Sequence, residues 1–182
     1  MKRFFLLGLA AACLSVWPTN AANAQNWPGF RGANAAGNGD GQNPPVTWDA
    51  EKNINIAWKT PIPGLAHASP IVWGDKLFVV SAVSSSPQGK FRHGLYGDVD
   101  SDKDISKHSW KLFCLDKKTG KILWERTATE GVPKVKRHIK STHASPSPVT
   151  DGKYVVYNDD VKTFFVGWVM VSGRAYPEKK GR

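Results

Sequence analysis

The stretch Leu112–Trp124, LFCLDKKTGKILW, contains a turn between two apolar runs and is the clearest guide to the fold. Asp116 and Thr119 are short polar residues whose oxygens can accept hydrogen bonds from the turn backbone. Gly120 can adopt the positive φ that such a turn requires. The stretch therefore predicts a β-hairpin, with strands at 110–115 and 121–126.

A second pattern occurs twice. His67–Val80 reads HASPIVWGDKLFVV, and His143–Val156 reads HASPSPVTDGKYVV. Each copy runs from His-Ala-Ser-Pro through a Gly/Asp turn into β-branched residues, which predicts a β-hairpin. A tryptophan precedes each copy, Trp58 in the first and Trp124 in the second, so the repeated unit is longer than the hairpin. Such units bury their faces by stacking on their neighbours.

The remaining chain adds strands but no helix. INIAWK at Ile54–Lys59 alternates apolar and polar residues and predicts a further strand. No window of about eleven residues has helical periodicity. The predicted fold class is therefore all-β, in antiparallel units, with further strands at 70–73, 76–82, 147–149 and 153–157.

On these residues, the chain resembles the quinoprotein-type, or PQQ-binding-like, β-propeller repeat. The family pattern is apolar-x-Ala-Leu-Asp-x-x-Thr-Gly-x-x-x-Trp, and the chain has Cys114 in place of the usual Ala. The resemblance covers about Trp27 to Asp159. The propeller lipoprotein of the outer-membrane barrel-assembly machinery shares this fold. The matching residues are Leu115, Asp116, Thr119, Gly120 and Trp124.

The resemblance implies a partial β-propeller. Propellers of this family have seven or eight four-stranded antiparallel blades of about 40–50 residues each. This chain would therefore supply about two to three blades of such a ring. Trp124 is expected to dock on the following blade, and Trp58 has the equivalent place one repeat earlier. His67 and His143 are expected to hydrogen bond the backbone where each blade starts. The alternative is that both histidines line one face of the ring as polar groups or metal ligands.

The N-terminus has the features of an export signal. Two basic residues precede the apolar run FFLLGLAAA, which is too short to span a bilayer, and the small residues Ala22 and Ala24 suit signal peptidase. We expect cleavage after Ala24 and a periplasmic or secreted protein. An uncleaved membrane anchor is one alternative, and a lipoprotein at Cys13 is another. The lipoprotein is less favoured because Ala10 stands where a lipobox has Leu.

The expected divisions are a signal peptide at 1–24, an arm at 25–53, the repeats at 54–160 with a polar insertion at 84–109, and an atypical tail at 161–182. The arm is expected to pack Trp27 and Phe30 on the domain. The tail lacks a second turn of the motif, so we expect a truncated or frameshifted reading frame near Asn158, with a native domain end as the alternative. No apolar stretch is long enough to predict a transmembrane span.

Cysteine and charge limit the function classes. Cys114 would be the one cysteine left after cleavage, so no intrachain disulfide can form. Its apolar surroundings predict a core residue. The formal net charge of +10 favours anionic surfaces, but the basic residues are scattered, and we expect no nucleic-acid partner. The densest basic group is expected to be a solvated loop, and comprises Lys134, Lys136, Arg137 and Lys140.

The polar insertion contains alternating carboxylates, at Asp98, Asp100, Asp102 and Asp104. Carboxylates in this spacing can converge on a calcium ion. The rest of a calcium loop is missing, because Lys103 stands in place of the sharp-turn Gly and Ser109 in place of the bidentate Glu. We therefore favour a solvated acidic loop and keep calcium as the alternative.

Two function classes fit the sequence. The first is an exported noncatalytic propeller that acts as a scaffold or protein-interaction module, with protein partners or the remaining blades. The second is part of a PQQ- and calcium-dependent quinoprotein dehydrogenase, which needs a stacked quinone, a calcium ion and a carboxylate base. The sequence lacks a vicinal Cys-Cys pair that could stack on the quinone. We therefore expect no catalytic residue and no cofactor.

Overall fold

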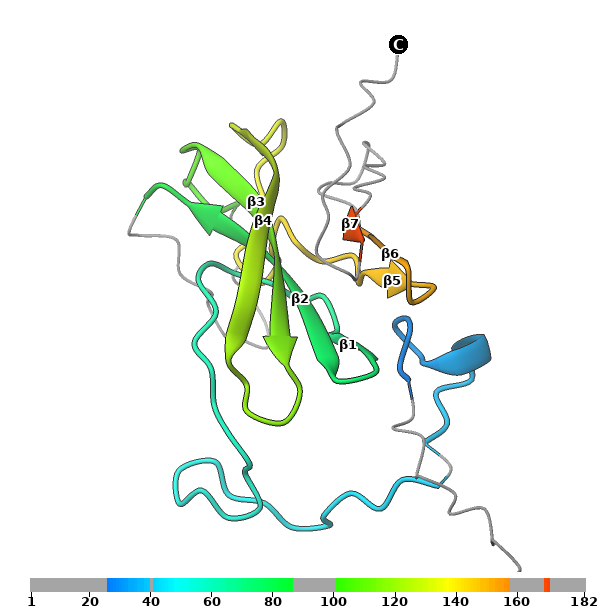
Figure 1. The fold of residues 1–182 in the computed structure, drawn as a ribbon. Coiled ribbons are helices and arrows are strands. Elements are labelled where there is room, and N and C mark those ends of the chain that lie inside the picture. Colours follow the sequence, from blue (N-terminus) through cyan, green and yellow to red (C-terminus); the bar gives the residue numbers. More distant parts are fainter. Residues whose placement is uncertain (1–25, 40, 87–100, 158–168, 171–182) are drawn as a thin grey trace, which may run out of the picture.

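A computed structural model describes residues 26–39, 41–86, 101–157 and 169–170, which form two antiparallel sheets (Figure 1). The first sheet runs in chain order: β1 (Ile71–Trp73), β2 (Lys76–Ser84), β3 (His108–Asp116) and β4 (Ile122–Gly131). The second contains β5 (Val149–Thr150), β6 (Tyr154–Val156) and β7 (Val169–Met170). Within these ranges the helical content is a single 3-10 turn, η1 (Ala33–Ala35). The all-β prediction is confirmed.

The three predicted hairpins are present, but one predicted strand is wrong. β1 and β2 pair around Gly74-Asp75, β3 and β4 pair across the LFCLDKKTGKILW turn, and β5 and β6 pair around Asp151-Gly152. Ile54–Lys59 is not a strand, and Ile54 forms only an isolated bridge to Asp49. Asn53 and Asn55 have φ values of 57° and 54°. This left-handed conformation, which Asn tolerates, interrupts an extended run.

One face of the first sheet forms the main core. Phe78 lies opposite Cys114, and Val80 lies opposite Leu112, so these four side chains share a face. All four are at most 2% exposed, and the core also includes Ile71, Val155 and Tyr157. Burial raises the pKa of the Cys114 thiol to about 11, although nearby Lys76 acts in the opposite direction. The prediction that Cys114 is a core residue is confirmed.

The opposite face of the first sheet is buried as well. Phe113 and Leu115 point to this side and are 0% and 1% exposed. The segment before β1 is bound along the sheet, because Ser81 Oγ donates to the Pro63 carbonyl (2.5 Å) and Leu65 pairs with Ala82. A β-sheet that is buried on both faces requires a neighbouring element on each side.

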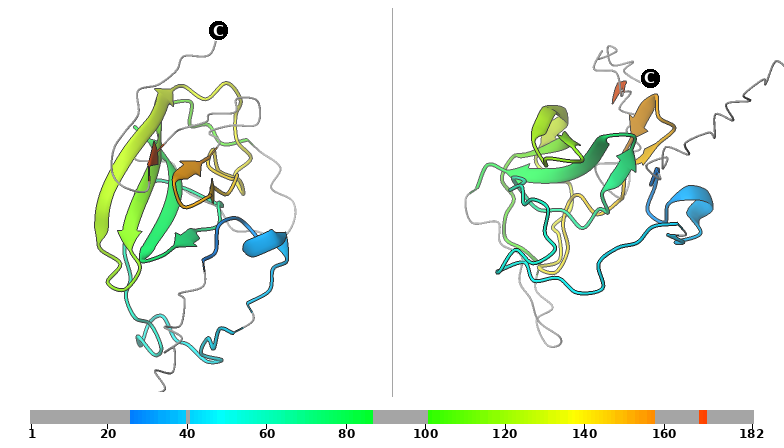
Figure 2. Two further views of the ribbon diagram at one scale, coloured as in Figure 1. Left: turned by 45° about the vertical axis from the view of Figure 1, so that its right-hand side comes forward. Right: turned by 60° about the horizontal axis from the view of Figure 1, so that its bottom comes forward.

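The N-terminal arm bridges the two sheets. Trp27 exchanges both backbone hydrogen bonds with Val72 of β1, at 2.8 and 2.9 Å. The Thr150 amide of β5 donates to the Pro28 carbonyl (2.8 Å), and Figure 2 shows the arm beside both hairpins. Phe30 is 66% exposed. The arm is therefore bound to the first sheet through the Trp27 backbone, whereas the predicted packing of Phe30 on the domain is wrong because Phe30 is largely exposed.

The two HASP copies lie side by side. The amides of His67 and Ala68 both donate to the Ala144 carbonyl at 3.1 Å, and the Ser69 amide donates to Ser147 Oγ at 2.8 Å. β5 contacts β1 directly. At the other end of the second hairpin, a Cβ added to Gly152 would lie 2.2 Å from the Trp73 ring. The second hairpin is thus packed against the first along its length.

Candidate functional site

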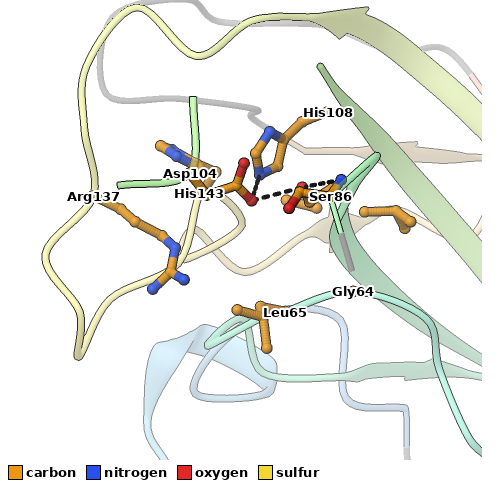
Figure 3. Close-up of a pocket in the computed structure, with 10 residues that line it drawn as sticks. Gly64, Leu65, Ser86, Asp104, His108, Arg137 and His143 are labelled. Carbon is orange, nitrogen blue, oxygen red and sulfur yellow. Dashed lines mark hydrogen bonds and ion pairs between the residues drawn. The ribbon is translucent and has the colours of Figure 1, made fainter. Parts of the chain in front are cut away.

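A cavity of about 180 Å³ lies where the end of β2 and the start of β3 meet the loops that precede the two HASP hairpins (Figure 3). Its walls combine aliphatic side chains with carboxylate, imidazole, guanidinium and hydroxyl groups. The lining residues are Gly64, Leu65, Ala82, Val83, Ser84, Ser86, Asp104, His108, Arg137 and His143. Carboxylate, imidazole and guanidinium groups thus come together around this partly open cavity.

Asp104 provides the buried carboxylate of this cavity, with a side chain that is 7% exposed. Its Oδ1 accepts hydrogen bonds from the amide and hydroxyl of Ser106, and its Oδ2 accepts one from Ser84 Oγ (2.6 Å). Burial acts to raise the pKa of Asp104, but these hydrogen bonds and nearby His108 outweigh it and lower the pKa to about 2. Asp104 therefore remains ionised at neutral pH.

His108 lies beside this carboxylate and is 4% exposed. Its Nδ1 is 2.9 Å from the Ser106 carbonyl. A carbonyl can only accept, so Nδ1 carries the hydrogen. Nε2 then faces Asp104 Oδ2 at 3.8 Å. Although serine, histidine and aspartate meet here, Ser84 donates to the carboxylate and not to the imidazole, which is not the order that activates a serine nucleophile.

The prediction that the basic group is a solvated loop is wrong for Arg137. Its side chain is 4% exposed, and Nη2 is paired with Asp102 Oδ2. Nη1 donates to the carbonyls of Ser141 (3.0 Å), Ile139 (3.4 Å) and His138 (3.5 Å). The Asp102 amide also donates to the Arg137 carbonyl (2.8 Å). Arg137 thus joins the insertion to the loop before the second HASP copy, whereas its neighbours Lys134 and Lys136 are exposed as predicted.

The insertion is not a solvated acidic loop where it is described. Asp102 is bound to Arg137, and Asp104 is bound to two serines, so their carboxylates point into different clusters. Asp98 and Asp100 lie outside the described residues, and the calcium alternative is untested for them. In the ranges that the structure covers, no three His, Cys, Asp or Glu side chains are grouped so as to hold a metal ion.

The two repeated histidines have different surroundings. His67 is exposed, and its backbone amide bonds the second HASP copy. His143 is 6% exposed, and its ring lies edge-on to His108 with centroids 5.1 Å apart. Its carbonyl accepts a hydrogen bond from Trp110 Nε1 (2.9 Å). Each histidine therefore forms a hydrogen bond through its main chain, His67 to the Ala144 carbonyl and His143 to the Trp110 indole. Of the two, only His143 lines the cavity.

The residues of the turn motif lie away from the cavity. Asp116 Oδ1 accepts hydrogen bonds from the Lys118 and Thr119 amides and from the Thr119 hydroxyl. These bonds, the Thr119 hydroxyl first, lower the pKa of Asp116. Gly120 has a φ of +71°, as the turn requires. The motif residues thus support the hairpin, with Leu115 buried beside them.

The tryptophans of the repeat are placed differently from each other. Trp58 Nε1 donates to the Lys117 carbonyl (3.0 Å), and its ring covers Gly120 of the turn. Trp124 packs within its own sheet, with its ring centroid 6.0 Å from that of Phe78, and the Arg126 guanidinium lies over it. Docking of Trp124 on a following blade remains a prediction.

No protein-family model matches the chain, and no curated protein sequence matches it. No helix in the described segments is long and apolar enough to cross a membrane. The signal peptide at 1–24, its cleavage after Ala24, the lipoprotein alternative at Cys13 and most of the tail at 161–182 lie outside those segments.

Acidification should destabilise the fold through Asp104. Its folded pKa of about 2 lies below the ordinary value of 3.8, so the unfolded chain binds more protons, and stability falls as the pH drops from about 4 to 2. The shift corresponds to about 2 kcal/mol. Asp104→Asn should remove this contribution to the pH dependence of the free energy of unfolding, which urea unfolding followed by circular dichroism measures at each pH. Equal slopes for the two proteins in this window would contradict the assignment, and equal slopes above about pH 5 are the internal control.

Proposed function

We propose that the chain forms blades of an exported, noncatalytic β-propeller repeat protein that acts as a scaffold or protein-interaction module. The observation that carries the proposal is the order of the first sheet. β1 to β4 follow one another as an antiparallel meander, and β5 of the next hairpin then lies beside β1. A propeller is built in this way, from four-stranded meanders whose first strands neighbour one another.

Glycine-to-tryptophan contacts support the same proposal. Trp58 covers Gly120 in the β3–β4 turn, and Trp73 covers Gly152 in the β5–β6 turn. In each pair, an indole from an earlier segment closes over a turn where any side chain would collide with it. Repeat proteins depend on such contacts between neighbouring units for their stability. A fold that displays loops around a ring provides a binding surface without a catalytic group.

The competing candidate is part of a quinoprotein dehydrogenase. The unfolding temperature, measured with and without the cofactors of that enzyme, distinguishes the scaffold from the enzyme. The full chain should unfold at the same temperature, within about 1 °C, with and without saturating PQQ plus Ca²⁺. A ligand at 100 times its Kd would add about 2.7 kcal/mol, which is a rise of roughly 5–10 °C at this chain length. Ca²⁺ alone and PQQ with a chelator are the controls. A rise that needs both ligands would favour the enzyme.

A further inference from the structure

Two hydrogen-bond acceptors face each other in the cavity. His108 Nδ1 carries its hydrogen toward the Ser106 carbonyl, so the neutral ring presents a lone pair at Nε2. This Nε2 lies 3.8 Å from Asp104 Oδ2 (Figure 3). Both side chains are buried, and two buried acceptors without a donor between them are unfavourable. A donor placed between the two atoms would satisfy both acceptors.

The geometry leaves room for such a donor. An N–H donor forms hydrogen bonds at about 2.8–3.0 Å, so a single nitrogen can lie within reach of both acceptors across the 3.8 Å gap. That nitrogen needs at least two hydrogens, one for each acceptor. Asp104 already accepts from Ser84 and Ser106, and a carboxylate has about four acceptor positions, so one remains for this donor.

The charges around the gap favour a cation. Arg137 lines the cavity, but its guanidinium is paired with Asp102. No other Lys or Arg is among the described residues that line the cavity, so a bound cation would face the Asp104 carboxylate without competition from one. His143 is the other titratable group that faces His108. The strand partners of His108, Ser84 in β2 and Gly131 in β4, are not titratable.

Part of the cavity lining is apolar, and the volume of the cavity limits the size of the ligand. Leu65, Ala82 and Val83 form this apolar part, and Gly64 adds backbone. The volume of about 180 Å³ is slightly above the roughly 150 Å³ that holds a benzene molecule in an engineered cavity. A short branched alkyl group fits this space, with its polar end at the acceptor pair.

We propose that this cavity binds a small primary alkylammonium ion, whose nitrogen donates to both His108 Nε2 and Asp104 Oδ2 while its alkyl group contacts Leu65, Ala82 and Val83. This ligand site does not depend on the proposed scaffold function, because its contacts all come from residues that line the cavity.

The test is titration of the full chain with isobutylamine, a five-heavy-atom probe, with isobutanol as the uncharged control of the same shape. Binding is followed by calorimetry and by the imidazole ¹⁵N signals of His108. We expect saturable binding with a Kd of about 1 mM for the amine. The alcohol should bind at least about tenfold more weakly, because it lacks the charge-assisted hydrogen bonds. The His108 Nε2 signal should shift with the amine and not with the alcohol.

Two variants connect binding to the acceptor pair. Asp104→Asn should weaken amine binding at least about tenfold, whereas Glu125→Gln, which removes an exposed carboxylate on β4, should change it less than about twofold. If Asp104→Asn does not fold, His108→Phe replaces it as a variant that keeps a ring but lacks Nε2. Equal binding of amine and alcohol, unchanged binding in the folded variant, or no saturable His108 shift would each overturn the proposal.

Discussion

Arg137→Ala is expected to lower the free energy of unfolding by about 3–5 kcal/mol, the range found when one partner of a buried ion pair is removed. The guanidinium is 4% exposed and satisfies the Asp102 carboxylate together with three backbone carbonyls. Alanine would leave all of these acceptors without their donor. Because the two loops that Arg137 joins both contribute to the cavity, its loss should also loosen the walls around His143.

Urea unfolding followed by circular dichroism measures this effect, with Lys136→Ala as the matched control. Lys136 is the preceding residue and is exposed, so its replacement should change stability by no more than about 0.5 kcal/mol. Adding Asp102→Ala to Arg137→Ala should cost much less than Asp102→Ala alone, because the two residues are coupled. Equal losses for Arg137→Ala and Lys136→Ala would show that the buried pair contributes nothing.

Gly120→Ala is expected to lower the free energy of unfolding by about 3 kcal/mol, because alanine would be strained in the left-handed conformation and would overpack the site. The φ of Gly120 is +71°, and the new Cβ would lie 2.3 Å from the Trp58 ring. The ring cannot withdraw freely, because its Nε1 is bound to the Lys117 carbonyl and Thr60 is bound to Gly120 itself. The substitution would therefore release the segment that covers one face of the first sheet.

The control variant Gly74→Ala measures the cost of backbone strain without a side-chain collision. Gly74 also has a positive φ, +57°, but nothing lies within 4 Å of an added Cβ, so its replacement should cost only about 1 kcal/mol. The difference between the two variants, measured by urea unfolding, is the contribution of the Trp58 contact. Losses of the same size at Gly74 and Gly120 would contradict close packing of Trp58 on the turn.

The hairpins could be predicted from the sequence because their signals are local. The Asp116–Gly120 turn and the Gly/Asp turns of the two HASP copies specify strand ends within a few residues. The segment Ile54–Lys59 was harder to predict, since it has a strand pattern that the left-handed Asn53 and Asn55 interrupt. Tertiary context overrides such weak strand preferences.

The cavity could not be predicted because its parts come together only through long-range pairing. Asp102 and Arg137 lie 35 positions apart in the chain, inside an acidic and a basic stretch that each suggested solvated loops. One usable signal is present: opposite charges in two loops, one before β3 of the first sheet and one before β5 of the second. His143 was singled out for its place in the repeat, but the repeat itself did not indicate that one histidine would be buried and the other exposed.

Native-state hydrogen exchange tests most directly whether the two hairpins form stacked, mutually dependent units. A hairpin as short as β5–β6 is marginal by itself, so its amides should be protected only through the first sheet. We expect the β6 amides to open within about 1 kcal/mol of those in β3, and Gly152→Ala to reduce β6 protection by about 2 kcal/mol or more while β3 retains more of its own. Unprotected β6 amides in the wild type, or β6 protection that Gly152→Ala leaves unchanged, would contradict the stacking of the two units.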